Sequence, residues 1–429
     1  MISAPDPVRI QAVIDALAPQ ESQAVYGVFD PARVPALAFE TFDEVSRVSA
    51  AVSPDCSYRL VQQAIDAAAH TLDLYIYNVS AQHLVDLLAT ARDRGVAVRI
   101  MVDAMDTNGG ERAKLAALGV ALKIAPSTGG RKVFTVCHQK FAVIDGRHLL
   151  IGSANWAGTA IPLVKVPGKF KKGNREWLMQ VEHAGLAGWF QTLFDADWAI
   201  PEMTGPAGLA GVEAAAEPLL LEVPMAAFQP PDEVFDILGP ALRQPARMLP
   251  LLSPDNYFAQ VLALIRGATR SIDLEQQYIK LGGPKTRALL EALASRQGEV
   301  QVRIIASATF PEAWKQTFDS LDAFGLAGRL RAMNPGYFTH LHNKGVLVDR
   351  RISVVSSTNW SENSITQARE AGLVVTSDEV GAYFARVMDF DWRVAIDPAD
   401  VPARLAALGD ALAALPPDER ERVHPADLR

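Results

Sequence analysis

Hydrophobic and polar residues follow the same order of helical and strand-like periods in two long stretches of the chain. Apolar residues recur at three- and four-residue intervals, as on one face of a helix, at Leu60, Ala64, Ala67 and Ala68 and later at Phe258, Val261, Leu262 and Ile265. Strand, helix and strand patterns follow each of these, at residues 72–77, 84–94 and 96–102 and again at 272–278, 286–296 and 300–305. The alternation predicts an α/β fold built from βαβ units, with a mostly parallel sheet in each stretch.

Short matching segments show that the second stretch is a copy of the first. Ser53-Pro54-Asp55 recurs as Ser253-Pro254-Asp255, and an Asp-x-Asp-Trp segment ends near Trp198 and again at Trp392. Such an internal repeat indicates a duplicated structural unit. We therefore divide the chain into an N-terminal extension (1–50), a first half (51–202), a linker (203–248), a second half (249–395) and a C-terminal helical tail (396–429).

Composition and charge narrow the class of protein. The 429 residues are 49% hydrophobic and 21% charged, as in an ordinary globular protein. No apolar run approaches the roughly 18 residues that a membrane span needs, and the first residues lack a signal-peptide pattern, so we expect a cytoplasmic protein. We expect a monomer, because one polypeptide carries both copies of the repeat. Two cysteines are too few for a disulfide scaffold or a four-cysteine zinc site. The net charge of −8 gives no general attraction to nucleic acid, so a polyanionic substrate must be held locally.

The candidate chemistry lies in one motif that occurs once in each half. His138-x-Lys140 is followed by Asp145 in the first half. His342-x-Lys344 is followed by Asp349 in the second half. Both His-x-Lys pairs lie in strand-like segments, so the two side chains of a pair share a face. The same residue types follow in both halves, namely Ser153, Asn155 and Glu176 in the first and Ser357, Asn359 and Glu370 in the second.

A phosphodiester is a suitable substrate for this residue set. Its cleavage requires a nucleophile, a proton donor for the leaving oxygen and cations for the phosphoryl oxygens. If the halves meet around a pseudo-twofold axis, one imidazole attacks phosphorus in line while the other protonates the departing alcohol, with Lys, Ser and Asn side chains on the oxygens. We expect no metal or other cofactor, because His340 and His342, two residues apart, have no suitably spaced third ligand.

The sequence leaves two assignments open. Each imidazole needs an acceptor on its second nitrogen, and the available carboxylates are Glu176, Glu370, Asp145 and Asp349. Which carboxylate orients which ring is undecided at this stage. Symmetry also gives no preference for which histidine attacks.

The doubled pattern H-x-K-x4-D-x6-G-S-x-N, with a glutamate downstream, resembles the phospholipase D superfamily of phosphodiesterases and phosphatidyltransferases. The resemblance covers roughly residues 53–395, and the second copy departs from it once, with Ser356 where the family has glycine. It implies a tandem repeat of two phospholipase D-like α/β/α sandwich domains with a shared active site. It also implies that His138 forms a phosphohistidine, that His342 is the acid, and that Lys140, Asp145, Lys344 and Asp349 complete the catalytic set.

A loop in the first half suggests a lipid substrate. Asn155 and Glu176 are 21 positions apart, whereas Asn359 and Glu370 are 11 apart, so the first half carries ten extra residues. These fall in the segment 161–173, where aliphatic residues alternate with lysines beside the expected cleft. We expect the apolar residues of this segment to contact acyl chains or a membrane surface transiently, and its lysines to steer a phosphate. The apolar residues are Ile161, Leu163, Val164, Val166 and Phe170. The residues at equivalent strand ends are further candidates for contact with the leaving group, with packing in the core as the equal alternative: Tyr75, Tyr77 and Asn78 in the first half and Glu275, Gln277 and Tyr278 in the second.

We therefore expect a phospholipase D-like enzyme that hydrolyses or transphosphatidylates a phospholipid. An endonuclease or nucleic-acid phosphodiesterase would use the same residues, but the acidic chain lacks the basic surface that nucleic-acid binding draws on. A non-catalytic phosphate- or lipid-binding protein is the third alternative. Against it, both His-x-Lys pairs are intact. Head group, acyl preference and the choice between hydrolysis and transfer are not readable from the sequence.

Overall fold

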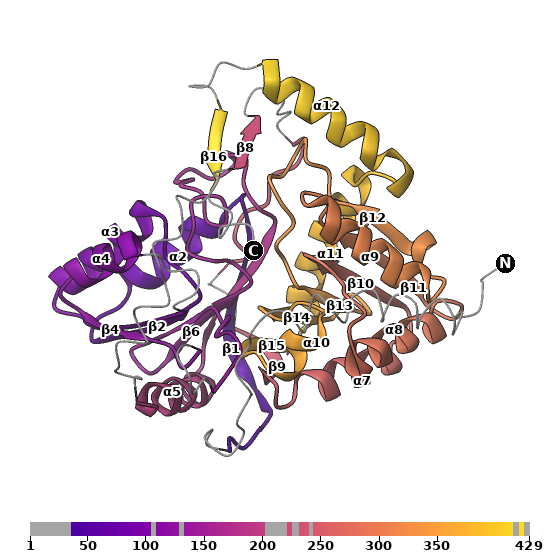
Figure 1. Cartoon of the computed structure of the whole chain (residues 1–429). Helices are drawn as coiled ribbons and strands as arrows, with labels where there is room; N and C mark the ends of the chain where they lie inside the picture. The colour runs from indigo at the N-terminus through magenta and orange to yellow at the C-terminus, as the bar shows by residue number, and fades with distance from the viewer. Residues whose placement is uncertain are drawn as a thin grey trace.

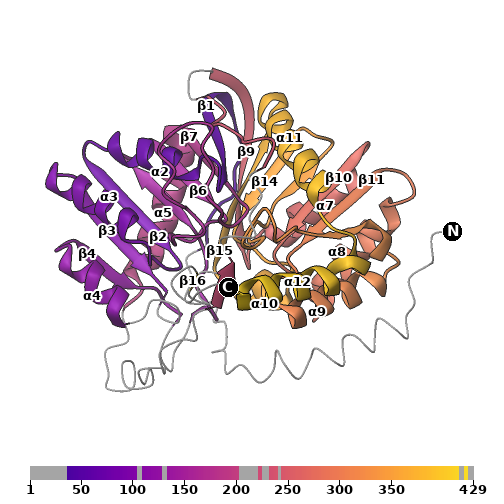
Figure 2. The same cartoon turned by 90° about the horizontal axis from the view of Figure 1, so that it is seen from above.

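A computed structural model describes residues 36–103, 109–127, 133–201, 221–224, 231–239, 243–414 and 420–423. Within these ranges, fourteen strands form one continuous sheet in the order β12-β11-β10-β13-β14-β15-β9-β1-β7-β6-β5-β2-β3-β4. The two halves lie side by side, with strands β1 (Phe42–Ser53) and β9 (Arg243–Ser253) between them (Figure 1). The view from above shows the same arrangement (Figure 2). The expectation of one separate sheet per half is therefore wrong.

The two halves contain equivalent elements. The first half comprises α2 (Ser57–Asp66), β2 (Thr71–Ile76), α3 (Gln82–Asp93), β3 (Ala97–Val102), α4 (Gly109–Ala117), β4 (Ala121–Ile124), β5 (Phe141–Ile144), β6 (His148–Gly152), β7 (Glu176–Glu182) and α5 (Ala184–Ala199). The second half comprises α7 (Tyr257–Gly267), β10 (Ser271–Gln276), α8 (Pro284–Arg296), β11 (Gln301–Ala306), α9 (Pro311–Asp322), β12 (Leu330–Ala332), β13 (Val346–Val348), β14 (Ile352–Ser356), α10 (Glu362–Thr366), β15 (Glu370–Thr376) and α11 (Asp378–Val394). The tail forms α12 (Val401–Ala414), and a separate two-stranded sheet pairs β8 (Leu221–Pro224) with β16 (Arg420–Val423).

The two central strands begin in the expected extension and linker and end inside the two halves. Strand β1 pairs antiparallel with β7 on one side and with β9 on the other, and β9 also pairs with β15. Joining the halves in this way satisfies backbone groups that two separate sheets would leave exposed at their edges. Among the named strands of the fourteen-stranded sheet, the parallel pairs lie in β2, β3 and β4 at one end and in β10, β11 and β12 at the other. The sheet is therefore mixed, and the expected mostly parallel sheet is corrected.

Helices cover both faces of the sheet, and the two faces have different cores. Side chains of β2 alternate between them: Leu72, Leu74 and Ile76 pack with α2 and α3 in a core of the first half, whereas Tyr75 faces the opposite side. On that side, α5 and α11 share one core that extends across both halves. Trp177 and Phe384 stack there with ring centroids 4.2 Å apart. None of the described helices has the length and hydropathy needed to cross a bilayer.

Two buried ion-pair clusters join the halves. Arg175 of the first half binds Asp391 of the second at 2.8 Å. Arg369 of the second half binds Asp197 of the first through two nitrogens, at 2.9 and 3.0 Å. Both arginines and both aspartates are at most 1% exposed. Removing one partner of such a pair leaves a buried charge without compensation, which is costly.

We expect Asp197→Ala to lower the free energy of unfolding by about 3 kcal/mol, because Arg369 then loses its bidentate partner in the interior. The matched control is Lys315→Ala, which removes an exposed pair with Asp319 on α9 and should cost less than about 1 kcal/mol. Urea unfolding of both variants would measure the difference. Equal losses for the two variants would contradict a structural role for the crossed arginine pairs.

Candidate active site

Each His-x-Lys pair lies in an extended segment just before a strand, where it contacts the backbone of the other half. His138 N donates to the carbonyl of Arg369 at 2.8 Å, and His342 N donates to the carbonyl of Arg175 at 3.2 Å. The regular strands begin only afterwards, at Phe141 in β5 and Val346 in β13, later than the hydrophobic pattern predicted. The extended backbone nevertheless places His and Lys on one face, as expected for residues two apart.

The carboxylate that orients each imidazole comes from the opposite half. His138 Nδ1 lies 2.9 Å from Glu370 Oε2, and His342 Nδ1 lies 2.7 Å from Glu176 Oε1. The centroids of the two imidazole rings are 6.4 Å apart. The structure therefore brings the two histidines together and shows which carboxylate holds which ring, an assignment that the sequence left open.

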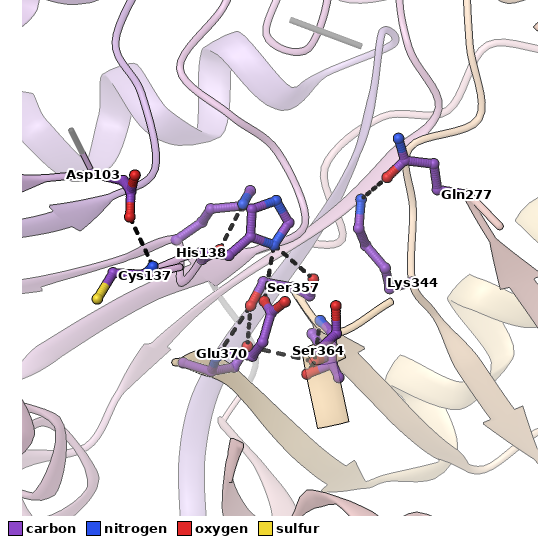
Figure 3. A network of polar contacts seen from close by, with 12 residues as sticks. Asp103, Cys137, His138, Gln277, Lys344, Ser357, Ser364 and Glu370 are labelled. Atoms are coloured by element: carbon purple, nitrogen blue, oxygen red, sulfur yellow. Dashed lines mark hydrogen bonds and ion pairs between the residues drawn. The ribbon is translucent and has the colours of Figure 1, made fainter. Parts of the chain in front are cut away.

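Serine residues hold the two glutamates in place. Ser153 Oγ donates to Glu176 Oε2 at 2.5 Å. Glu370 is hydrogen-bonded to Ser357 and Ser364, and the carbonyl of Ser357 also lies 3.1 Å from His138 Nδ1 (Figure 3). Ser153 and Ser357 were expected to bind substrate, and the structure places them on the orienting carboxylates instead.

The two lysines have unequal surroundings. Each Nζ donates to the carbonyl of the histidine in its own motif, at 2.6 Å for Lys140. Lys344 Nζ also donates to Gln277 Oε1 at 3.1 Å (Figure 3). Lys140 Nζ lies 5.1 Å from the ring centroid of Tyr77, and the ring of Tyr77 meets that of His138 edge-on at 4.6 Å. Tyr77 and Gln277 thus border the histidines on opposite sides of the site.

The motif asparagines, Asn155 and Asn359, are buried, and some of their polar atoms make no hydrogen bond within the described part of the chain. Among the described residues, neither Oδ1 nor Nδ2 of Asn155 has a hydrogen-bond partner, and Oδ1 of Asn359 has none. Burying an unpaired amide is unfavourable. A bound group with both donors and acceptors, or an anion accepting from Nδ2 of Asn155, would relieve that cost.

The two motif aspartates do not belong to this group. Asp145 accepts hydrogen bonds from the backbone nitrogens of Ala69, His70 and Thr71. Asp349 does the same for Thr269, Arg270 and Ser271. Both aspartates sit in tight turns with positive φ, at the start of β2 or β10, whereas the histidines lie near the ends of those strands, six residues or about 20 Å away. The expected catalytic role of Asp145 and Asp349 is thus corrected to turn stabilisation.

The serine that departs from the family pattern is matched by a change on the neighbouring strand. Gly152 pairs with Leu178 across β6 and β7, and a Cβ at Gly152 would lie 2.8 Å from the carbonyl of Trp177. In the second half, Ser356 pairs with Gly372, where a Cβ would lie 2.8 Å from that of Ser356. The glycine of the pair lies on β6 in the first half and on β15 in the second, so Ser356 has room and does not obstruct the site.

Burial is the largest single influence on the pKa of each of the four central groups. It lowers the pKa of His138 well below its usual value, with Lys140 and Lys344 acting in the same direction. It also lowers the pKa of His342, although Glu176 opposes that shift. Burial raises the pKa of Glu370 to about 8. For Glu176, burial acts upward but His342 and Lys344 outweigh it, so its pKa lies below the usual value.

Residues that the sequence argument did not assign to the site also support it. Arg175 and Arg369 directly precede the two glutamates, and their backbones hold the histidine segments of the other half. The repeated Arg-Glu dipeptide and the repeated Asp-x-Asp-Trp segment were visible signals for these contacts. Within the described ranges, no group of three or more His, Cys, Asp and Glu side chains is arranged to hold a metal ion.

Comparison with known proteins finds a matching family model and several similar curated proteins. The family model described as cardiolipin synthase, PLD-like domain, matches residues 61–198 and 261–392, which together are more than half of the chain. A mitochondrial cardiolipin hydrolase from Chlamydomonas reinhardtii is 29% identical over 136 residues, which cover 31% of this chain and 54% of that protein. The protein of the same name from Homo sapiens is 29% identical over 138 residues, covering 32% and 48%. The chain thus spans about half the length of these curated relatives.

A solved structure shares the fold over almost the full length. Phosphatidylserine synthase from Haemophilus influenzae Rd KW20 superposes with a TM-score of 0.56 at 14% identity, covering 92% of this chain and 91% of that one. At this identity the match concerns the fold alone. The family model matches one segment in each half, and each segment carries one His-x-Lys motif. The chain therefore belongs to the PLD-like domain family of the phospholipase D superfamily.

Proposed function

We propose that this protein cleaves the phosphodiester of a phospholipid through a covalent intermediate on His138, and transfers the phosphatidyl group to water or to an alcohol. The crossed pairing of His138 with Glu370 and of His342 with Glu176 carries the proposal. Reacting atoms must approach to about 3–3.5 Å for in-line displacement. Two imidazoles whose centroids are 6.4 Å apart leave a separation suited to one phosphorus atom between them.

The hydrogen bonds of His138 favour it as the nucleophile. A backbone carbonyl only accepts, so the contact with Ser357 requires the proton of the neutral ring to be on Nδ1. The lone pair is then on Nε2, the nitrogen that must attack phosphorus. The lowered pKa of His138 keeps the ring in this neutral form.

The surroundings of His342 favour it as the acid. Glu176, whose pKa is lowered, is ionised and supports a protonated ring at 2.7 Å. A bound phosphodiester adds negative charge beside the two lysines and so raises the affinity of His342 for a proton. As His138 Nε2 bonds to phosphorus, the bond from phosphorus to the alcohol oxygen breaks and that oxygen takes the proton of His342. His342 then removes a proton from water or an alcohol, whose oxygen displaces His138 from phosphorus.

The segment 161–173 supports a substrate in a lipid surface. Ile161 and Val164, which were expected to contact acyl chains, are instead buried in the protein. Leu163 is 43% exposed and Val166 54%, and the only other large hydrophobic residue exposed to this degree among those described is Val45. Lys165, Lys169 and Lys171 are exposed alongside them. Aliphatic side chains flanked by lysines suit contact with an anionic bilayer. The names of the curated relatives also point to a phospholipid.

The proposal is tested by incubating the protein with cardiolipin and phosphatidylcholine vesicles containing a short alcohol, and separately with single- and double-stranded DNA, all with a chelator present. Release of head group or formation of a phosphatidylalcohol is the expected result. Cleavage of DNA alone would replace the proposal with a nuclease function. Binding without turnover of any substrate would indicate a non-catalytic phosphate- or lipid-binding protein.

The different roles proposed for His138 and His342 predict that the covalent intermediate can be trapped. With a nitrophenyl phosphodiester, whose leaving group departs without protonation, His342→Ala should release about one nitrophenol per enzyme and then stall, because no base activates water. The phosphoryl group should remain on His138, as peptide mass spectrometry would detect. His138→Ala should give neither burst nor label. A burst in His138→Ala with a label on His342 would reverse the assigned roles.

The pKa of Glu370 predicts a pH effect on stability. Its value in the folded protein, about 8, lies above the ordinary 4.5, so the protonated carboxyl stabilises the fold at low pH and this contribution is lost as pH rises through that interval. Relative to Glu370→Gln, the wild type should therefore lose stability on the order of a few kcal/mol between about pH 5 and about pH 8. Urea unfolding at both pH values measures this.

Glu176→Gln is the matched control for this pH effect. Because the pKa of Glu176 is lowered, its contribution changes only below the ordinary value of 4.5. The difference between this variant and the wild type should therefore stay constant over the same interval. A similar pH dependence for both variants would contradict the unequal charge states of the two glutamates.

The exposed aliphatic residues of the loop predict a defect specific to lipid surfaces. The double substitution Leu163→Ser and Val166→Ser should lower turnover of vesicle phospholipid by about tenfold or more. Each substitution removes roughly 1.5–3 kcal/mol of favourable free energy that the aliphatic side chain gains on burial in the bilayer. Turnover of a soluble nitrophenyl diester should fall much less. Val45→Ser is the matched control, because Val45 is equally exposed but lies eight residues, about 26 Å, from Ser53 at the base of the loop. Equal losses of turnover on both substrates would contradict a role of the loop in membrane binding.

A further inference from the structure

A fully buried carboxyl group on β10 contacts a second carboxyl group on α11. Oε2 of Glu275 accepts a hydrogen bond from Asn343 Nδ2 at 2.9 Å, and its side chain is also hydrogen-bonded to that of Asp391. Oε1 of Glu275 and Oδ2 of Asp391 are buried, and no donor group of the described side chains or backbone reaches either oxygen. Two carboxyl groups can share a hydrogen bond only when one of them carries a proton.

Arg175 shows which carboxyl group keeps that proton. Its guanidinium donates to Asp391 Oδ1 from Nε at 3.2 Å and from Nη2 at 2.8 Å. A carboxylate that accepts from an arginine is stabilised in its charged form. The direct donor to Glu275 is the neutral amide of Asn343. Burial, and after it the charge of Asp391, raise the pKa of Glu275 well above its usual value. Glu275 is therefore the donor of the shared hydrogen bond and Asp391 the acceptor.

The first half has a neutral O–H donor at the same place. Tyr75 on β2 is the counterpart of Glu275, and its hydroxyl donates to Asp197 Oδ2 at 3.2 Å. Asp197 is the counterpart of Asp391 and accepts from Arg369. Both halves thus complete a buried arginine–aspartate pair with an uncharged O–H group. Burial raises the pKa of the Tyr75 phenol well above its usual value, so the first-half donor keeps its proton at far higher pH than a carboxylic acid does.

Glu275 is connected to the segment that carries His342. Asn343, which donates to Glu275, directly follows His342. The backbone nitrogens of His342 and Asn343 donate to the carbonyl of Arg175 at 3.2 and 3.0 Å. Arg175 in turn precedes Glu176, whose carboxylate orients the His342 ring. A displacement of Glu275 would therefore reach His342 through its neighbour in the chain.

The surroundings of Glu275 are poorly suited to a further negative charge. Arg175 already binds two aspartates, Asp55 at 2.7 Å and Asp391 at 2.8 Å. An ionised Glu275 would add a third carboxylate beside this one guanidinium, and repulsion between buried charges is weakly screened. That repulsion would favour separation of Glu275 from Asp391. The neighbours of Glu275 in the adjacent segments of the sheet carry no ionisable group: Ile305 on β11 and Gly345 just before β13.

We propose that Glu275 is held as a neutral carboxylic acid that donates to Asp391, and that loss of this proton as pH rises opens the contact between the His342 segment and Arg175. The proton passes to the solvent when the contact opens, while Asp391 stays ionised. Glu275 takes no part in the displacement at phosphorus. The device acts on the second half alone, because Tyr75 fills the equivalent position of the first half with a group that stays neutral.

Amide hydrogen exchange tests the opening without any substrate. The wild type is compared at each pH with Glu275→Gln, whose amide nitrogen can donate to Asp391 and whose carbonyl can accept from Asn343 but which cannot ionise. The pKa of Glu275 is raised in the closed cluster and returns toward its usual value on opening, so rising pH favours the open form of the wild type. For the peptide that contains His342, the ratio of the wild-type exchange rate to that of the variant should rise by up to about tenfold per pH unit.

The matching peptide of the first half, which contains His138, is the internal control. Its backbone is held by Arg369 in the same way, and its exchange ratio should stay constant with pH. A constant ratio for the His342 peptide would overturn the proposed opening. An equal rise for both peptides would overturn it as well, since the effect would then belong to the whole interface between the halves.

Infrared difference spectroscopy tests the charge state of Glu275 directly. Near neutral pH, the wild type should show one protonated-carboxyl band that Glu275→Gln lacks, and the band should disappear at alkaline pH. Glu182→Gln is the matched control: at Glu182 burial acts upward but the hydrogen bond from Arg147 outweighs it, so its pKa is lowered and no such band should be lost. Absence of the Glu275 band would overturn the neutral acid. Neither measurement involves turnover, so this inference and the proposed function fail or stand independently.

Discussion

The bond between each catalytic imidazole and a glutamate of the opposite half is the constraint on which the rest of the structure depends. Neither half contains a complete site, because His138 is oriented by Glu370 and His342 by Glu176. The halves must therefore be fixed relative to each other to within the tolerance of a hydrogen bond. Three features serve this end: the antiparallel pairing of β1 with β9, the core shared by α5 and α11, and the crossed ion pairs of Arg175 and Arg369.

The same segments provide both the rigidity and the chemistry. Arg175 and Arg369 each bind an aspartate of the other half through the guanidinium and a histidine segment of the other half through the backbone. The next residue in each case is the orienting glutamate. A shift of one half against the other would thus break the ion pair and the imidazole hydrogen bond together, which couples the integrity of the fold to that of the site.

Duplication supplies a symmetric frame, and a few substitutions make its two sides unequal. Tyr77 faces Gln277 across the site, and Val136 is replaced by His340 in the second half. The carbonyl of Ser357 lies within hydrogen-bonding distance of His138 Nδ1, and burial leaves Glu370 with a much higher pKa than Glu176. In-line displacement requires such a difference, because one histidine must begin as a neutral nucleophile and the other as an acid.

The sequence by itself determined the duplication, the α/β class and the two His-x-Lys pairs, because repeats, hydrophobic periods and short motif spacings are properties of neighbouring residues. It also included Glu176 and Glu370 among four candidate orienting acids, but it counted Asp145 and Asp349 among those candidates and in the catalytic set. Spacing along one strand does not show at which end of a sheet a side chain lies, and these aspartates cap turns at the far end.

Only the tertiary structure decided the fusion into one sheet, the crossed pairing of histidine with glutamate and the inequality of the two sides. These depend on contacts between residues more than 150 positions apart, such as Glu176 with His342, and on the loss of solvent around them. Neither quantity is encoded in local pattern, since both arise when two separately recognisable halves bury their charged groups against each other.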